Sequence, residues 1–323
     1  MFAAGIERES QTEFIRDVRS GLGQGGQKEL PSAYLYDEIG AALFETITLL
    51  PEYGLTRADA RLLESHAGDL ARWLPARLRV AELGSGSGRK TRWVLEALAK
   101  NGPLDYHPID ISRSALVKCR GELGRIHGVA MREIEQPYLD GLKAAVAARK
   151  RRQALLVLFL GSTIGNFERP RAEEFLRSVR AELAAGDTLL LGTDLVKPVN
   201  QLLAAYNDPV GVTAAFNLNI LARINRELDG EFVLANFEHQ ALYNSSERRI
   251  EMHLRSKCEQ AVKIRAADLT VRLDEGETIW TESSHKFRAE EVREMAARAG
   301  FRCDAQWIDP EWPFAESLLT AAA

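Results

Sequence analysis

Three glycines at alternate positions give this sequence its clearest sign of ligand binding. They lie in the segment Glu82-Leu-Gly-Ser-Gly-Ser-Gly-Arg-Lys90, between an apolar run and a helical pattern. Glycine lets the backbone turn tightly and lets a ligand approach without an intervening Cβ atom. A purely structural turn needs fewer glycines, so the spacing favours a binding loop that includes Gly84, Ser85 and Gly86.

An acid and a base accompany this loop. Asp110 ends the next expected strand, where an acid can accept hydrogen bonds from ribose hydroxyls. The alternative is that Asp110 only stabilises the start of the following helix. Lys90 stands where a ligand carboxylate can meet a helix N-terminus, although an exposed helix residue is the alternative there too.

A second loop, Gly161-Ser-Thr-Ile-Gly-Asn166, follows another buried strand. Because α/β sheets bind ligands at the carboxyl ends of their strands, Asn166 is a candidate binding residue. The alternative is a turn residue in the left-handed conformation. Asp194 ends a further strand, and the sequence assigns it no role.

The cysteines and histidines predict neither a metal site nor a disulfide framework. The three cysteines are widely spaced without a C-x-x-C pair, and the six histidines form no H-E-x-x-H pair. We therefore expect no metal cofactor.

Alternating strand and helix patterns place the two loops on a doubly wound α/β sheet. Buried strands are expected at 78–83, 106–111, 154–160 and 188–192, with a short one at 129–134. Helices are expected at 90–100, at 112–123 with Ser112 as N-cap, and at 171–183. The alternation of helix and strand returns later in the chain, with a helix at 289–299, Gly300 after its C-terminus and a strand at 301–307.

The pattern changes after about residue 197. A helical region over 199–228 precedes period-two segments at 249–255, 261–265 and 269–273, which are typical of a half-exposed antiparallel sheet. The simplest arrangement is an α/β core over 61–196 plus 287–323. A second, discontinuous α+β domain then combines 1–60 with 197–286.

Composition restricts the class of protein. The chain has 323 residues, 46% hydrophobic and 27% charged, with a formal net charge of -4, which suits a globular protein of about two domains. It has no basic excess for nucleic acid. Its longest purely apolar run, 154–160, is far too short to span a membrane, and its first ten residues lack the pattern of a signal peptide. We expect a cytoplasmic protein that acts on a small molecule.

The G-x-G-x-G spacing after an acidic residue resembles the first motif of Rossmann-like methyltransferases that use S-adenosylmethionine. Over nearly the whole chain, the sequence is also similar to one family, the histidine-specific Nα-methyltransferases of ergothioneine biosynthesis. The resemblance implies transfer of three methyl groups to the α-amine of L-histidine, giving hercynine. It is carried by YDEIGAALFETITLLPEYGLTRAD at 36–59, AELGSGSGRKT at 81–91, LVLFLGSTIGNF at 156–167, LLLGTDLVK at 189–197, DPVGVTAAFNLNILARINREL at 208–228, SSERRIEMHLRS at 245–256 and ETIWTESSHKFRAE at 277–290.

The resemblance also implies residues beside the reacting amine. Tyr53 resembles the tyrosine next to that amine. Gly161 and Asn166 resemble the base of the site, with Asn166 at the substrate carboxylate and amine. Tyr206 and Thr213 resemble positions on the carboxylate side. By sequence alone, the alternative for Tyr53 is a packing residue in a turn.

A further group resembles the residues that read the imidazole ring: Met252, Glu282 and Ser284. Neutral imidazole has one N–H donor and one acceptor nitrogen, which Glu282 and Ser284 can satisfy, while Met252 supplies an apolar wall. Without the resemblance, Met252 is a core residue and Glu282 a solvated acid. Phe44 resembles an aromatic residue of the substrate side. The residues that the resemblance assigns to S-adenosylmethionine are Tyr36, Gly84, Ser85, Gly86, Lys90, Asp110, Tyr138 and Gly161.

Two departures from the family pattern stand out. After Tyr53 the chain continues Gly54-Leu-Thr-Arg57, where members often have Y-P-T-R, which predicts a more flexible loop. After the third strand, where an acid commonly faces adenine, the chain has Gln136-Pro137-Tyr138. Proline cannot make that side-chain hydrogen bond, which leaves Tyr138 as the candidate for contact with adenine.

The chemistry agrees with the absence of a catalytic triad. Displacement of a methyl group from a sulfonium by a neutral amine needs alignment more than a strong acid or base. Small Gly161 leaves room for methyl groups, and aromatic rings attract the charge that grows on nitrogen. Three alternatives stay open: the same fold acting on another amino acid such as tryptophan, a non-catalytic S-adenosylmethionine-binding module, and an NAD-dependent oxidoreductase. The last is disfavoured because Arg89 occupies the third glycine position of G-x-G-x-x-G.

Overall fold

The computed structural model describes residues 2–23 and 25–322. The chain divides into two compact units. Unit 1 comprises Met1–Tyr53 and Pro198–Ser284, and unit 2 comprises Gly54–Lys197 and His285–Ala323. Residues 54–60 fall in unit 2, whereas the sequence pattern grouped them with the first 53 residues. The reason is that helix α3 (Leu55–Trp73) packs on α4 and β14 of unit 2.

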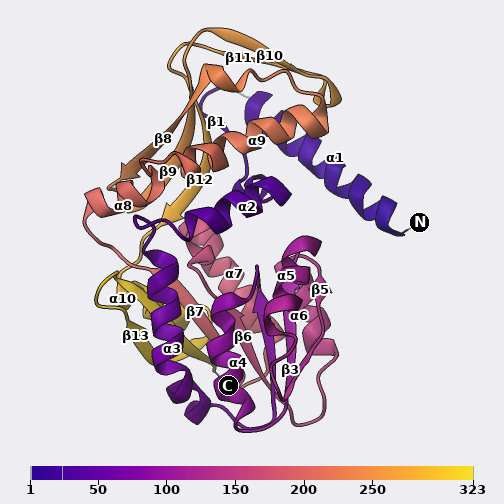
Figure 1. The fold of residues 1–323 in the computed structure, drawn as a ribbon, viewed down its shortest axis with the longest axis vertical. Coiled ribbons are helices and arrows are strands. Elements are labelled where there is room, and N and C mark those ends of the chain that lie inside the picture. Colours follow the sequence, from indigo (N-terminus) through magenta and orange to yellow (C-terminus); the bar gives the residue numbers. More distant parts are fainter. Residues whose placement is uncertain (1, 24, 323) are drawn as a thin grey trace. The chain divides into compact units, whose positions relative to one another are not determined.

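Unit 2 is built on a sheet with the strand order β13-β14-β7-β6-β2-β3-β4 (Figure 1). The order β4-β3-β2-β6-β7 is that of a doubly wound Rossmann sheet, with its switch point between β2 and β6. This confirms the expected Rossmann-like core. Strand β14, which the sequence did not predict, runs antiparallel between β7 and β13. The strands are β2 (Leu78–Leu83), β3 (Leu104–Asp110), β4 (Val129–Met131), β5 (Ile134–Glu135, paired with β3), β6 (Ala154–Phe159), β7 (Thr188–Asp194), β13 (Phe301–Ile308) and β14 (Phe314–Ala321).

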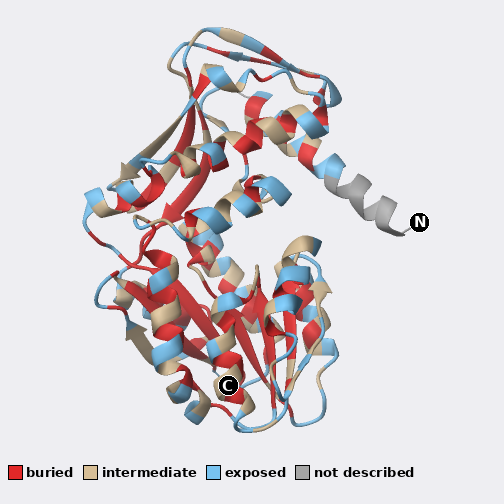
Figure 2. Cartoon of the chain, viewed as in Figure 1, coloured by how far each residue is buried: buried red, intermediate tan, exposed pale blue. Residues whose placement is uncertain are grey.

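Helices cover both faces of this sheet. One core lies between the strands and α6, α7 and α10, and the other between the strands and α3, α4 and α5. Along β6, Leu155 and Val157 belong to the first core and Leu156 and Leu158 to the second, which explains why this run is continuously apolar. Figure 2 shows these strands as buried. The helices are η2 (Arg89–Thr91), α4 (Arg92–Ala99), α5 (Arg113–Leu123), α6 (Tyr138–Ala147), η3 (Thr163–Asn166), α7 (Arg169–Glu182) and α10 (Ala289–Arg298).

Two local sequence signals in unit 2 have clear outcomes. Ser112 is the N-cap of α5, as predicted, and its hydroxyl accepts a hydrogen bond from the Ala115 amide at 3.3 Å. Gly54 is the N-cap of α3, and a Cβ atom there would lie 2.2 Å from the ring of Trp312. Glycine at this position therefore serves close packing.

Unit 1 combines a four-stranded sheet, in the order β1-β12-β9-β8, with a two-stranded sheet of β10 and β11. The segments near 261 and 269 thus pair with each other and form a sheet of their own. Strand β9 buries Ile250, Met252 and Leu254 as expected, but His253 on its other face is buried as well. The elements are α1 (Phe2–Gly23), β1 (Lys28–Glu29), η1 (Ser32–Leu35), α2 (Glu38–Ile47), α8 (Val199–Tyr206), α9 (Val212–Leu228), η4 (Leu234–Asn236), β8 (Phe237–Asn244), β9 (Arg249–Ser256), β10 (Gln260–Ile264), η5 (Arg265–Ala267), β11 (Leu269–Leu273) and β12 (Thr278–His285).

Within the described ranges, no helix is both long and apolar enough to cross a membrane. The same ranges contain no group of three or more His, Cys, Asp or Glu side chains placed to hold a metal ion.

Candidate functional site

The glycine loop after β2 has the backbone conformation that its sequence predicts. Gly84, Gly86 and Gly88 have φ values of 71°, 53° and 70°, in the left-handed region that disfavours other residues. The amides of Gly84 and Ser85 donate to the carbonyl of Ile109 at 2.8 and 3.2 Å, which ties the loop to β3. No described atom lies within 4 Å of the position a Cβ would take at Gly86. The loop therefore leaves open space at its centre.

Asp110 holds this loop from the end of β3. One carboxylate oxygen accepts from the Gly86 amide at 3.1 Å, and the other accepts from the Ser112 amide at 2.9 Å. Burial raises the pKa of Asp110 above its usual range. Asp110 thus stabilises the start of α5, which is the alternative role that the sequence predicted for it. A third backbone hydrogen bond comes from Ile111, which leaves one of the four lone-pair directions of the carboxylate to a ligand.

Glu82 is buried beneath the loop. Its carboxyl accepts from the hydroxyl of Thr91 at 2.6 Å and from the hydroxyl of Tyr106. Burial raises the pKa of Glu82 to about 7, against the effect of these two hydrogen bonds. The acid at the start of the glycine motif therefore joins β2, η2 and β3 and supports the loop from below.

Lys90 forms an ion pair that sequence reasoning missed. Its ammonium donates to Asp59 on α3, and the same Asp59 oxygen accepts from the Gly161 amide at 3.0 Å. A Cβ atom at Gly161, where φ is 72°, would lie 3.0 Å from the Lys90 ammonium. Asp59 thereby connects the two loops that follow β2 and β6. The available signal was a charged residue among the apolar residues of a helix, next to Ala58 and close to Leu62.

The loop after β6 turns through two left-handed residues, Gly161 and Ser162, with φ of 72° and 60°. The Ser162 hydroxyl accepts from the Asp194 amide at 2.8 Å, which fixes this loop on the end of β7. Asn166 ends helix η3 and is half-buried. Asn166 does not have a positive φ angle, so its alternative interpretation as a left-handed turn residue is wrong.

Asp194, which the sequence left without a role, is the centre of a buried ion-pair cluster. It pairs with the ammonium groups of Lys197 at 2.5 Å and Lys286 at 2.9 Å, and it accepts from the indole N–H of Trp312 at 3.1 Å. Burial lowers the pKa of Lys197 to about 8. All these contacts lie within unit 2, and Asp194 is a structural residue there.

Tyr138 flanks the glycine loop. A Cβ atom at Gly84 would lie 3.2 Å from its hydroxyl, and its ring meets Phe159 edge-on at 5.6 Å. Burial raises the pKa of Tyr138 to about 12. Pro137 is the N-cap of α6, which begins at Tyr138. The departure at residues 136–138 therefore starts a helix and brings an aromatic side chain to the loop.

Unit 1 gathers four predicted aromatic residues and Phe216 into one group, here called the aromatic cluster: Tyr36, Phe44, Tyr53, Tyr206 and Phe216. Ring centroids are 5.5 Å apart for Tyr36 and Phe44, 6.2 Å for Phe44 and Tyr53, and 6.1 Å for Tyr53 and Tyr206. Phe216 lies 5.4 Å from Tyr36 and 6.0 Å from Phe44. Sequence reasoning missed Phe216, although it stands in the block that contains Thr213.

A polar group adjoins the aromatic cluster. The hydroxyls of Tyr206 and Ser284 are 2.7 Å apart. Glu282 and Ser284 occupy alternate positions of β12 and so face the same side of the strand. Met252 lies on the neighbouring strand β9, where its carbonyl accepts from the Thr281 hydroxyl at 2.9 Å. The structure thus brings Tyr206 and Ser284 into contact and places Met252 on the strand next to Glu282.

A buried network that the sequence did not reveal supports this group. The Thr281 hydroxyl donates to the Asn217 side chain at 2.6 Å, and the Asn217 amide donates to the His253 carbonyl at 3.0 Å. His239 Nε2 donates to the carbonyl of Tyr206 at 2.7 Å, and burial lowers the pKa of His239. The signal was a polar residue, Asn217, in an otherwise apolar stretch of α9.

Thr213 lies in the first turn of α9 and is buried. Its amide donates to the carboxylate of Asp208 at 2.7 Å, as does that of Val212 at 3.0 Å. Although burial opposes ionisation, these hydrogen bonds lower the pKa of Asp208. Asp208 thereby caps the helix that carries Thr213.

Comparison with known proteins covers both units. A family profile described as "Histidine-specific methyltransferase, SAM-dependent" matches residues 14–321. A histidine N-alpha-methyltransferase of Mycobacterium tuberculosis is 43% identical over 305 residues, 94% of this chain and 93% of that protein. The protein of that name from Mycolicibacterium smegmatis is 42% identical over the same shares. An L-tryptophan methyltransferase of Psilocybe serbica is 28% identical over 88% of this chain and 86% of its own.

Proposed function

Since the chain belongs to the histidine-specific, S-adenosylmethionine-dependent methyltransferase family, we propose that it transfers three methyl groups to the α-amine of L-histidine. The product is hercynine, an intermediate of ergothioneine biosynthesis. One observation carries this proposal: 43% identity to a histidine N-alpha-methyltransferase over 94% of the chain. The matched residues include parts of both units, because the alignment covers 94% of the chain.

The glycine loop of unit 2 is our proposed site for S-adenosylmethionine. The open space at Gly86 leaves room for a ligand beside the backbone. The remaining lone-pair direction of Asp110 suits a ribose hydroxyl, and the Tyr138 ring suits adenine. Lys90 uses one of its three N–H donors on Asp59, so two can bind the methionine carboxylate. Ser85, Gly161 and Tyr36 complete this proposed set as the family resemblance implies.

Residues of unit 1 are proposed to bind the imidazole ring. Glu282 accepts the ring N–H, and Ser284 donates to the other ring nitrogen. The contact of 2.7 Å between Tyr206 and Ser284 supports this arrangement. In this contact either hydroxyl can be the donor, and a serine hydroxyl can both donate and accept. Met252 forms the apolar wall, and Thr213 lies on the carboxylate side.

The transfer itself asks the chain to orient an amine and to accommodate charge. When bound, S-adenosylmethionine supplies an electrophilic methyl carbon on a sulfonium. The amine lone pair forms the N–C bond while the C–S bond breaks, and one proton leaves the nitrogen in each round. Tyr53 and Asn166 orient the amine, and Gly161 leaves room beside it. Tyr36 and Phe44 attract the cationic methylated nitrogen through their rings.

Mass spectrometry of a reaction with L-histidine tests this function. We expect the mono-, di- and trimethylated amino acids in succession. Absence of the trimethylated product would overturn the proposal. Turnover of tryptophan at a higher kcat/KM would favour the second candidate, to which the Psilocybe serbica relative points. Glu282 and Ser284 together favour histidine, because they can satisfy the N–H donor and the acceptor nitrogen of its ring. The cytoplasmic location expected from the sequence stays a prediction.

A further inference from the structure

Two buried carboxyl groups meet within unit 2. Asp59 lies on α3 and Glu316 in the middle of β14, and their exposed fractions are 0% and 1%. Both carboxyls lie beside the Gly161 amide: it donates to Asp59 at 3.0 Å, and a Cβ atom at Gly192 would lie 3.2 Å from it and 2.8 Å from Glu316 Oε1. Among the residues that the structure describes, no N–H or O–H group donates to either oxygen of Glu316 or to Oδ1 of Asp59. Of two adjacent buried carboxyls, one has a strongly raised pKa and keeps its proton while the other ionises.

The surrounding charges decide which carboxyl holds the proton. Asp59 Oδ2 accepts from the Lys90 ammonium and, at 3.0 Å, from the Gly161 amide, whereas within the described ranges neither oxygen of Glu316 has such a donor. Glu316 pairs opposite Gly192 of β7, and a Cβ atom there would lie 2.8 Å from its Oε1. Burial and the nearby Asp59 raise the pKa of Glu316 well above its ordinary value. These observations favour Glu316 as the protonated member of the pair.

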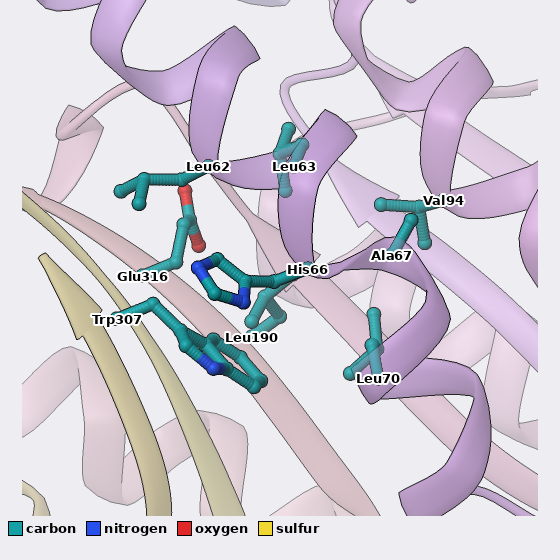
Figure 3. Close-up of a pocket in the computed structure, with 9 residues that line it drawn as sticks. All are labelled: Leu62, Leu63, His66, Ala67, Leu70, Val94, Leu190, Trp307 and Glu316. Carbon is teal, nitrogen blue, oxygen red and sulfur yellow. The ribbon is translucent and has the colours of Figure 1, made fainter. Parts of the chain in front are cut away.

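The other side of Glu316 is apolar. Figure 3 shows its carboxyl at a small cavity formed mainly by side chains of α3, together with Val94, Leu190 and Trp307. His66 is the titratable group on this side. It interacts with Asp69 at 2.9 Å and stacks on Trp307 at 5.1 Å. Asp59, Lys90 and His66 are therefore the ionisable groups near Glu316 on α3 and η2; Lys90 favours the ionised form of Glu316, but burial and Asp59 outweigh it and raise its pKa.

We propose that Asp59 and Glu316 form a proton-sharing pair that positions Lys90 and the Gly161 loop for the methyl donor. The inference rests on the proposed function, because Lys90 and Gly161 belong to the proposed S-adenosylmethionine site. Neutral Glu316 fixes Asp59 with a hydrogen bond and adds no second charge. Asp59 then holds the ammonium of one loop and the backbone amide of the other. Both are positioning residues, since neither touches the ligand.

Two matched carboxyl-to-amide variants test this assignment, with S-adenosylmethionine alone as the calorimetric probe. Asp59→Asn removes the charge that holds Lys90, so Kd should rise ~10-fold or more, as for loss of a charged hydrogen bond. Glu316→Gln keeps a neutral group that donates to Asp59, so Kd should stay within about threefold.

Asp187→Asn is the control for a merely structural effect. Asp187 is also buried, but it pairs with Arg149 at 2.6 Å where β7 begins, at the opposite end of the strands from the loops. We expect this variant to lower the melting temperature and leave Kd unchanged. If Asp59→Asn behaves like Asp187→Asn, or if Glu316→Gln weakens binding as much as Asp59→Asn, the proposal is overturned.

A pH profile covers the case in which Asp59→Asn does not fold. Above the raised pKa of Glu316 the pair holds two negative charges, so wild-type affinity should fall on the alkaline side. Glu316→Gln should bind without that decline. Parallel profiles of the two proteins contradict the proposal. A wild type that binds S-adenosylmethionine without methylating histidine refutes the proposed function alone, whereas a wild type that does not bind it refutes both.

Discussion

At the scale of single residues, recognition of the imidazole ring depends on a few polar atoms. Glu282 is buried, so an uncharged side chain at this position would leave the ring N–H of a bound histidine without an acceptor. We expect Glu282→Ala to lower kcat/KM for histidine by ~10²-fold, the scale of losing a buried charged hydrogen bond. Steady-state kinetics with histidine check this, and an unchanged value would show that Glu282 does not read the ring.

Tyr206→Phe isolates the hydroxyl that orients Ser284. The substitution removes the contact of 2.7 Å and keeps the ring that lies 6.1 Å from Tyr53. One neutral hydrogen bond is worth about 1 kcal/mol, so KM for histidine should rise roughly 5-fold. The affinity for S-adenosylmethionine serves as internal control and should not change. A loss confined to S-adenosylmethionine binding would contradict the role given to Tyr206.

Glu82 makes stability depend on pH. Its pKa is raised from 4.5 to about 7 in the folded protein by burial. The folded state therefore holds this proton more tightly than the unfolded state, and stability should fall by about 2–3 kcal/mol as pH rises through this window. Glu82→Gln should flatten the profile in thermal unfolding between these pH values. A wild-type contribution that grows with pH would show the wrong sign.

At the scale of elements, the glycine loop separates stability from binding. Gly88 packs against α5, where a Cβ would lie 2.6 Å from Leu123 and 2.8 Å from Cys119, whereas Gly86 faces open space. Both have positive φ, so alanine strains each by about 1–3 kcal/mol. Gly88→Ala should lose more unfolding free energy because of the added clash. Gly86→Ala should lose less stability and should weaken S-adenosylmethionine binding instead.

Denaturant unfolding and calorimetry of these two variants measure the difference. Equal stability losses would mean that the contact with α5 does not matter.

The sequence predicted this loop and the strands of the sheet because three glycines and continuous apolar runs are local signals. It missed β14, whose polar Glu316 and Ser317 interrupt the apolar pattern that marks a central strand. It also missed the role of Asp59, because ion pairs between distant segments leave no mark on spacing.

At the scale of the whole molecule, the chain passes between its two units three times. Residues beside each crossing are fixed within unit 2: Gly54 lies against Trp312, and Lys197 and Lys286 share the carboxylate of Asp194. The sequence predicted a discontinuous arrangement from a change of pattern near 197. It could not locate the first crossing, because the pattern of α3 does not reveal which sheet it covers.

Asp194→Asn tests the importance of this cluster. Removing the carboxylate shared by two buried ammonium groups should cost about 3–5 kcal/mol of unfolding free energy. Chemical denaturation measures the loss, with Asp187→Asn as the matched variant at the other end of β7. A change below 1 kcal/mol would mean that the cluster does not stabilise unit 2.

We expect this chain to trimethylate histidine at its α-amine. The most direct test is a time course with methyl-labelled S-adenosylmethionine and equimolar histidine and tryptophan, followed by mass spectrometry. We expect label on histidine alone, ending in a product with three labelled methyl groups on the α-nitrogen. Label on tryptophan, or a histidine product that stops at one or two methyl groups, would contradict it.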